Sequence, residues 1–166
     1  DYRHVIFHPE GQPIVHRKTD NPEQPDELWW KSNGVWVPAP QWEGTQIYDI
    51  VASAISSEPN DWTLAIADYQ SIQLFNSNFE LFQLDYVADG VPLRARHMVF
   101  HHREVETPSG QSYVFEDLYI ANQEEGLLQL DITGAELDDH WSPSGPPAAL
   151  VRCIDAWNDQ MWVASG

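Results

Sequence analysis

Short apolar segments, each closed by a polar turn, run along most of the chain. Three of them follow one another at 62–67, 71–75 and 79–84, and an Asn-Ser-Asn turn separates the last two. Segments of this length and spacing predict a meander of antiparallel strands. The best helical pattern lies at 47–55, but it is short and contains β-branched side chains. We therefore expect a buried strand there, with one helical turn as the alternative.

The strand pattern repeats along the chain. The seven residues from Leu64 (LAIADYQ) align with those from Leu118 (LYIANQE), with Leu, Ile and Ala in register. Once two extra residues are allowed in the second copy, 72–81 also aligns with 128–137. Further copies start at 28 and 161, so successive starts are 36, 54 and 43 residues apart. A mean spacing of about 44 residues is typical of the four-stranded blades of a β-propeller.

We expect an all-β fold, a β-propeller or partial β-propeller of about four blades, each an antiparallel four-stranded sheet. The two ends of the chain resemble complementary halves of one blade. The ring would then be closed by shared strands or completed by another chain, or the sequence would be a segment of a longer propeller. A second register, in which residues 14–16 form an inner strand, stays open. The expected parts are outer strands of a split blade at 1–18, a blade at 19–46, a blade at 47–89, a blade at 90–141 with an inserted hairpin at 104–116, and inner strands of a split blade at 147–166.

One short motif is similar to a known repeat. The pattern aromatic-Val-x-Ser/Thr-x-x-Gly-Leu resembles the two-component regulator propeller repeat. Trp29–Val35 fits it with one residue fewer, Tyr119–Asn122 fits with Asn for Ser/Thr, and Trp162–Ser165 fits until the chain ends. The copy at Leu64 departs most, with Ala65 in place of the aromatic residue. The resemblance implies a ligand-binding sensor region of a bacterial signalling protein.

The net charge of the chain limits the classes of partner that it is expected to bind. Lys+Arg 8 against Asp+Glu 26 give a formal net charge of -18. The longest basic group is Arg17-Lys18, so we expect neither nucleic acid nor direct membrane binding. The acidity indicates solubility, with attraction of cationic or metal-bearing ligands as the alternative.

Targeting and cysteine signals are sparse. No apolar run approaches the ~20 residues of a membrane span, and no signal peptide is recognisable. The chain begins at Asp1 without an initiator Met, which suggests a processed or cut chain. The single cysteine, Cys153, lies in an apolar run and is expected to be a small core residue.

Motifs for catalysis or metal binding are weak. His4 and His8 are four residues apart, as are His97 and His101, but such positions on a strand lie about 13 Å apart. That distance is too long for one ion, so we expect no metal site and no cofactor. Nucleophile-elbow, zinc-protease and phosphate-loop motifs are absent from the sequence, so no catalytic residue is expected.

The aromatic residues have two expected roles. Trp29, Trp62, Tyr119 and Trp162 recur at one repeat position, which predicts packing between blades. Other polar and aromatic residues fall in loops that share one rim of a propeller, the usual ligand face. The candidate ligand-binding residues on this rim are Trp42, Tyr69, Gln70, Gln123, Glu124 and Trp141.

These expectations favour a non-catalytic ligand-binding or protein-interaction module of a sensor protein, periplasmic or extracellular. Its partner would be a small molecule or glycan, or a neighbouring protein domain, and the chain could also form a homo-oligomer that completes the propeller. The alternative is a propeller-scaffold carbohydrate-active enzyme, a hydrolase or lyase. Its carboxylates near the axis would come from Asp49, Asp68 and Asp155.

Overall fold

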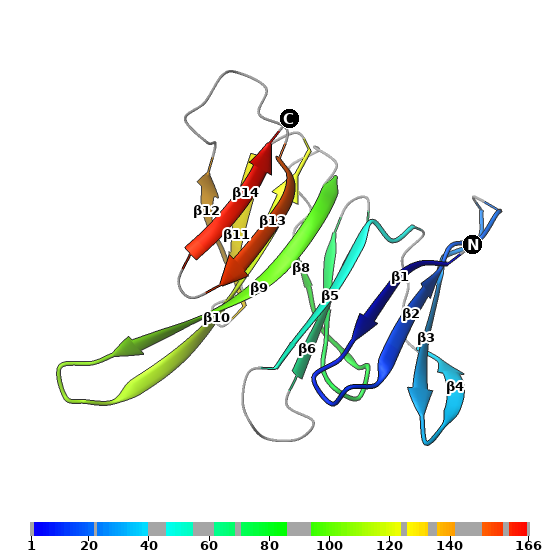
Figure 1. The fold of residues 1–166 in the computed structure, drawn as a ribbon, viewed down its shortest axis with the longest axis horizontal. Helices are drawn as coiled ribbons and strands as arrows, with labels where there is room; N and C mark the ends of the chain where they lie inside the picture. Colours follow the sequence, from blue (N-terminus) through cyan, green and yellow to red (C-terminus); the bar gives the residue numbers. More distant parts are fainter. Residues whose placement is uncertain are drawn as a thin grey trace. The chain divides into compact units, whose positions relative to one another are not determined.

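The chain is described by a computed structural model in which every regular element of the described residues is a β-strand (Figure 1). The described residues are 2–21, 23–39, 46–54, 62–68, 71–85, 94–123, 126–132, 136–141, 151–157 and 160–165. The chain divides into two compact units, Asp1–Leu93 and Arg94–Gly166. Each unit is built from hydrogen-bonded antiparallel meanders, as the spacing of the short apolar segments predicts.

The first unit opens with a four-stranded sheet in the order β1-β2-β3-β4. Asn33 and Gly34 join its last two strands with φ values of 49° and 81°, the left-handed pair that a two-residue hairpin turn requires. Because φ is positive at both positions, Asn and Gly suit this turn better than other residues. The strands are β1 (Tyr2–Phe7), β2 (Pro13–Arg17), β3 (Glu27–Ser32) and β4 (Val35–Pro38).

The second sheet of this unit has the order β5-β6-β7-β8. Asn76 shapes the turn between its last two strands, because its side-chain Oδ1 accepts hydrogen bonds from the amides of Asn78 and Glu80, each at 3.0 Å. The strands are β5 (Asp49–Ala54), β6 (Trp62–Ala67), β7 (Ile72–Phe75) and β8 (Leu81–Asp85). The segment 47–55 therefore contributes a strand, as its β-branched residues predict.

Apolar side chains from both sheets form the core of the first unit. Alternation along β2 and β3 turns every second side chain towards the second sheet, and cross-strand partners share a face. Burying a large aliphatic or aromatic side chain of this kind contributes about 1.5–3 kcal/mol. The buried members of the core are Ile14, Leu28, Ile47, Ile50, Trp62, Leu64, Ile66, Phe75 and Phe79.

The second unit contains a four-stranded sheet in the order β12-β11-β10-β9 and a two-stranded sheet of β13 and β14. Ile154 of β13 is buried with Ala121 and Leu127, so the small sheet packs on the larger one. The strands are β9 (Ala95–Glu106), β10 (Ser112–Asn122), β11 (Gly126–Asp131), β12 (Glu136–Trp141), β13 (Val151–Trp157) and β14 (Gln160–Ser165).

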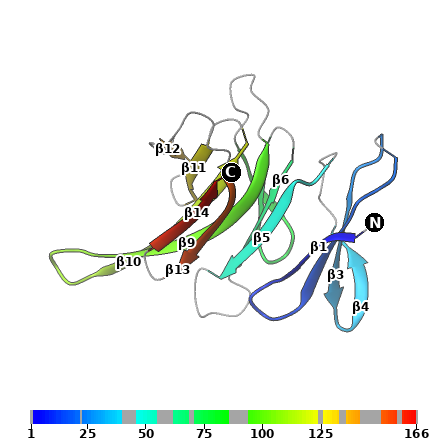
Figure 2. The same ribbon diagram turned by 45° about the horizontal axis from the view of Figure 1, so that its top comes forward.

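The strands β9 and β10 extend into a long hairpin that projects beyond the rest of their sheet (Figure 2). Their pairing continues as far as Ser112 opposite Glu106. Thr107 and Gln111 close the turn, where the Thr107 amide donates to the Gln111 carbonyl at 2.8 Å. Residues 104–116 thus lie in this hairpin.

The hydrogen bonds do not follow the division of residues 1–18 from 19–46 that the repeat suggested. β2 pairs with β3, with Ile14 opposite Trp30, so both segments belong to one sheet. Nor do residues 14–16 form a first strand, because β2 lies between β1 and β3. Alternation specifies a strand and its two faces, but not the position of that strand within a sheet. Counted in chain order, the strand at Leu28 (β3) is therefore the third of its sheet. The strands at Leu64 (β6) and Leu118 (β10) are each the second of theirs.

Candidate functional site

The first sheet has an apolar face that points away from its core, called here the outer face. Val5, Val15, Trp29 and Pro38 are consecutive cross-strand partners and therefore form one row across this face. Val5 is 58% exposed, and Phe7 on the same strand is 65% exposed. Apolar side chains gathered on one exposed face are typical of a binding surface rather than of bulk protein surface.

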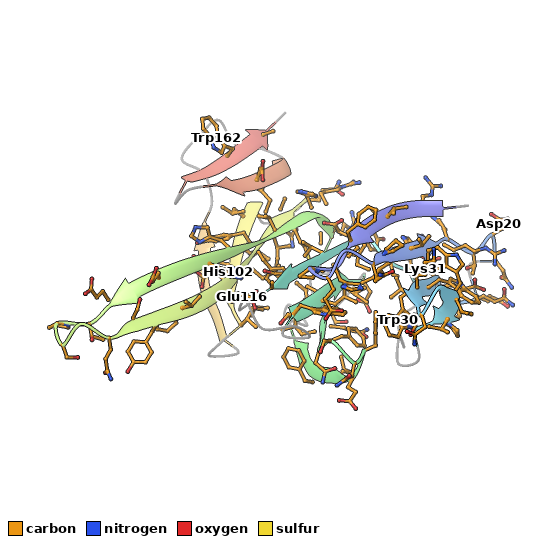
Figure 3. All side chains as sticks on the ribbon, turned by 60° about the horizontal axis from the view of Figure 1, so that its bottom comes forward. Asp20, Trp30, Lys31, His102, Glu116 and Trp162 are labelled. Carbon is orange, nitrogen blue, oxygen red and sulfur yellow. The ribbon has the colours of Figure 1, made fainter. Side chains whose placement is uncertain are left out.

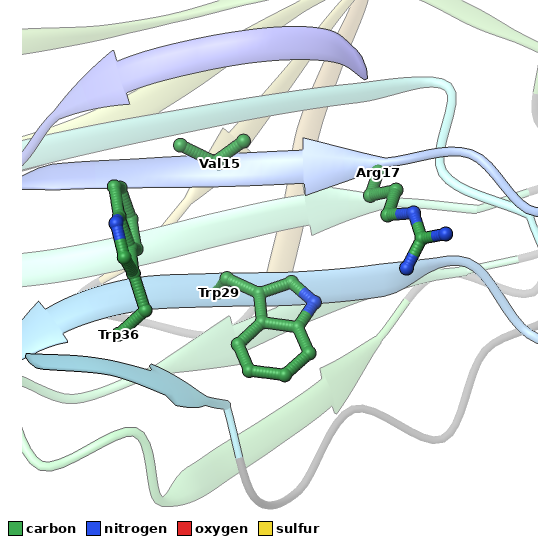
Figure 4. A pocket seen from close by; sticks show the side chains of 4 residues that line it. All are labelled: Val15, Arg17, Trp29 and Trp36. Carbon is green, nitrogen blue, oxygen red and sulfur yellow. The ribbon is translucent and has the colours of Figure 1, made fainter. Parts of the chain in front are cut away.

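A hollow of about 490 Å³ lies on the outer face (Figure 4). Val15, Arg17, Trp29 and Trp36 line it, and they come from the three adjacent strands β2, β3 and β4. Trp36 is 46% exposed, so one face of an indole is available to a ligand. The hollow combines two aromatic rings with a cationic group, the mixture that polar ring-containing ligands require.

Glu27 holds two of the lining side chains in place. Its Oε2 accepts a hydrogen bond from Arg17 Nη1 at 3.1 Å and another from Trp29 Nε1 at 3.0 Å. The ion pair is half exposed, so it contributes little to stability. It does fix the orientation of the indole and of the guanidinium before a ligand arrives.

The local charge differs from that of the whole chain. Among the described residues of β2, β3 and β4, the outer face carries Arg17, the carboxylate of Glu27, and Lys31, which is the cross-strand partner of Trp36. The chain as a whole carries a formal charge of -18. The outer face is therefore a basic patch on a strongly acidic protein, which favours an anionic ligand there.

A second hollow, of about 530 Å³, adjoins the first at Trp29. It is formed by the loop between β2 and β3 together with the end of β4. Thr19 organises this loop, because its hydroxyl donates to the carbonyls of Asn21 and Gln24 at 3.2 and 2.9 Å. The lining residues are Thr19, Gln24, Pro25, Asp26, Glu27, Leu28, Trp29, Pro38 and Ala39.

Beneath this loop, on the inner face of the first sheet, lies a polar network of two histidines and two aspartates. The rings of His4 and His16 lie edge to edge with centroids 5.1 Å apart and planes 17° from parallel, and their Nδ1 atoms are 2.9 Å apart. His16 Nε2 lies 3.0 Å from Asp26 Oδ2, and both side chains are at most 4% exposed. His4 Nε2 lies 3.9 Å from Asp49 Oδ1. Burial lowers the pKa of His16, an effect that the hydrogen bond to Asp26 opposes.

Asp26 connects three parts of the first unit. Its Oδ1 accepts a hydrogen bond from the Thr19 amide at 3.1 Å, and its Oδ2 accepts one from the Ile47 amide at 3.0 Å as well as one from His16. Asp26 therefore ties the loop that lines the second hollow to β2 and to the start of the second sheet.

A comparable contact lies in the described part of the second unit. His102 Nε2 lies 2.9 Å from Glu116 Oε1, and the two residues are cross-strand partners on β9 and β10 (Figure 3). Glu116 is buried, whereas the side chain of His102 is 37% exposed. The contact anchors the base of the long hairpin, and neither hollow described above includes it.

Most of the rim residues expected from the sequence fall outside the described residues. This holds for Trp42, Tyr69, Gln70 and Glu124, and for the side chain of Trp141. Gln123 is described, in the turn after β10. Its amide donates to the Arg94 carbonyl at 3.1 Å, and its Oε1 accepts a hydrogen bond from Arg96 Nη2.

The four aromatic residues assigned to one repeat position have different environments. Trp62 is buried and Tyr119 is partly buried against the core of the second unit, as expected. Trp29 instead lines the hollow on the outer face, and Trp162 is 61% exposed (Figure 3). For Trp29 the expectation is wrong because its strand is third in the sheet and Leu28 takes the inward position. The Asn-Gly turn between two Trp-bearing strands was the sequence signal for this site.

The three acids of the enzyme alternative do not line either hollow. Asp49 lies beside His4, and Asp68 accepts a hydrogen bond from the Ser71 amide in the turn between β6 and β7. Asp155 belongs to the second unit and is exposed. Among the described residues, no group of three or more His, Cys, Asp or Glu side chains could hold a metal ion.

Comparison with protein-family models, with curated proteins and with solved structures finds no match. The described part of the chain has no helix of the length and apolar character needed to cross a membrane.

Proposed function

We propose that this chain is a non-catalytic recognition module, part of a β-propeller in the extracytoplasmic sensor region of a signalling protein. Successive four-stranded antiparallel meanders support the propeller, because each sheet repeats the same strand order along the chain. The resemblance of the Trp29–Val35 and Tyr119–Asn122 segments to two-component regulator repeats supports the sensor role.

The observation that carries the binding role is the hollow on the outer face. Trp29 and Trp36 offer flat apolar rings, and Arg17 and Glu27 offer charged hydrogen-bonding groups at the same place. A pyranose ring presents an apolar face of C–H groups and a rim of hydroxyls, so it matches such a surface. We therefore propose an oligosaccharide as the ligand.

The charge of the outer face selects among sugars. Arg17 and Lys31 exceed Glu27 there, while the rest of the chain is acidic. A sugar that bears a carboxylate gains from the patch, and a neutral sugar does not. Oligomers of galacturonic acid should therefore bind more tightly than oligomers of glucose of equal length.

The test is a calorimetric titration of the protein with both kinds of oligomer. Trp36→Ala should weaken binding by about tenfold, since one aromatic contact contributes about 1–1.5 kcal/mol. Trp162→Ala is the matched control, because it removes a tryptophan from the other unit that is even more exposed, at 61% against 46% for Trp36. Equal losses from both variants, or no binding by either oligomer, would contradict the proposal. A dimer that Trp36→Ala dissociates would instead assign the outer face to a second copy of the chain.

A further inference from the structure

The histidine pair, in which His16 is buried and the side chain of His4 is 32% exposed, joins two sheets, and its hydrogen bonds determine where its protons lie. His4 is on β1 and His16 on β2 of the first sheet, while Ile47 and Asp49 lie at the start of the second. Asp26 is an acceptor at His16 Nε2, so this nitrogen must carry a hydrogen. A neutral His16 then has a bare Nδ1, which accepts a hydrogen bond from the Nδ1–H of His4 over 2.9 Å.

This arrangement can take up one proton without losing a hydrogen bond. The atom that remains bare is His4 Nε2, which faces Asp49 Oδ1 at 3.9 Å. A proton at this atom creates an ion pair with Asp49 and leaves both other contacts intact. A second proton must go to His16 Nδ1, where it would place two N–H groups against each other over 2.9 Å. The two rings must then separate.

We propose that His4 and His16 form an acid-sensitive latch, which holds the first sheet to the start of the second while the pair carries at most one extra proton and opens when it takes two. The charged groups around the pair are Arg3 on β1, Asp26 before β3 and Asp49 on β5. Opening moves His16 away from Asp26 and frees the carboxylate from one of its three donors. The amide contacts of Asp26 with Thr19 and Ile47 then weaken together.

The latch shares residues and strands with the proposed binding site. Asp26 lines the second hollow, and Thr19 belongs to the same loop. Along β2 and β3, His16 lies between Val15 and Arg17, and Leu28 lies between Glu27 and Trp29. An open latch should therefore loosen the strands that carry the hollow on the outer face. This regulatory consequence rests on the proposed function, whereas the latch itself does not.

Amide hydrogen exchange tests the latch without any ligand. Protection factors of the Ile47 and Thr19 amides, which correct for the intrinsic effect of pH on exchange, should fall by about tenfold or more between about pH 7.5 and about pH 5. The amides within β7, a fully buried strand, should keep their protection over the same range. Unchanged protection of Ile47 and Thr19 would overturn the proposal.

A variant at His4 separates the latch from general acid unfolding. In His4→Asn the amide can donate to a neutral His16 or turn over and accept from a protonated one. The acid-dependent loss of protection should therefore shrink to about threefold or less in this variant, with protection near pH 7.5 retained. His102→Gln, a change at the exposed histidine of the second unit, should behave as the parent chain. If His4→Asn retains the full acid-dependent loss, the pair is not the latch.

Ligand titrations at the same two pH values then test the regulatory consequence. The parent chain should bind the acidic oligomer less tightly at the lower pH, and His4→Asn should lose less affinity. If exchange follows the prediction but no oligomer binds at either pH, the latch stands and the proposed function fails. If affinity is independent of pH while exchange changes, the latch does not regulate the site.

Discussion

The imidazole of His8 stacks on the indole of Trp62, with ring centroids 4.9 Å apart and planes 10° from parallel. His8 follows β1 in the first sheet, and Trp62 begins β6 in the second. Both side chains are at most 4% exposed. The Glu10 amide donates to His8 Nδ1 at 3.2 Å, so the ring hydrogen lies on Nε2, which has no hydrogen-bond partner among the described residues.

Substitutions at His8 should separate the stability gained from its stacking on Trp62 from the stability lost by burying its Nε2–H without a partner. His8→Ala removes the ring and should destabilise the first unit by about 1–3 kcal/mol. His8→Phe keeps the stack and removes the buried N–H, so it should cost less than the alanine variant. Urea unfolding near pH 7.5 measures both. A phenylalanine variant that is as unstable as the alanine variant would show that the stack contributes nothing.

Stability should fall on acidification. Burial is the largest cause of a lowered pKa for both His8 and His16 in the folded chain, whose unperturbed value is 6.5. Below that value the unfolded chain binds protons that the folded chain does not, so the free energy of unfolding decreases as pH falls from 6.5 towards the folded pKa values. Above about pH 7.5 this contribution is fully present and constant.

Denaturant unfolding at a series of pH values checks this dependence. The slope should be at most about 1.4 kcal/mol per pH unit for each of the two histidines. In His8→Phe the part due to His8 should disappear and the part due to His16 should remain. A curve in which stability rises towards pH 5 would contradict the sign.

Two phenylalanines three residues apart provide a matched test of the core. Phe79 is 1% exposed and contacts Trp30 and Trp62 at centroid distances of 4.5 and 5.5 Å. Phe82 is 50% exposed. Phe79→Ala should therefore cost about 3–5 kcal/mol, and Phe82→Ala about 0.5 kcal/mol or less. Thermal unfolding of the two variants measures the difference. Similar losses of stability in both variants would contradict the burial of Phe79 in the core.

The turn before Trp36 should be sensitive to backbone conformation alone. Gly34 has φ of 81°, and a Cβ added there would meet nothing within 4 Å. Gly34→Ala should therefore cost about 1 kcal/mol through backbone strain, and it should weaken ligand binding because β4 carries Trp36. Asn33→Gly keeps a residue that tolerates positive φ and serves as the control. Calorimetric titration gives the change in affinity, and urea unfolding gives the change in stability. Equal effects of the two substitutions would argue against a positive φ at Gly34 as the cause.

Much of the local structure follows from short-range features. The short apolar segments at 62–67 and 72–75, and the Asn-rich turn at 76–78, predict strands and a turn that the structure contains. The Asn33-Gly34 pair likewise indicates a hairpin. These features act within a few residues, where side-chain parity and φ preferences decide the conformation.

The candidate binding site was harder to predict from the sequence than the strands and turns. Trp29 was expected in the core because its segment resembles those at Leu64 and Leu118, but it faces outward from a third strand. The His4–His16 contact spans twelve positions and arises only when β1 pairs with β2. Spacing along one strand, which argued against a metal site, says nothing about partners on the next strand.

The sequence by itself determined that this chain forms antiparallel strands joined by specific turns, because parity and turn preferences are local. Only the tertiary structure decided which strand is third in its sheet, which tryptophans line a hollow, and which histidine meets which aspartate. Those outcomes depend on strand register and on the packing of one sheet on another, and alternation is compatible with more than one register. The apolar core selects between them, since a one-residue slip would turn Ile14 and Leu28 away from the buried cluster that also contains Ile66.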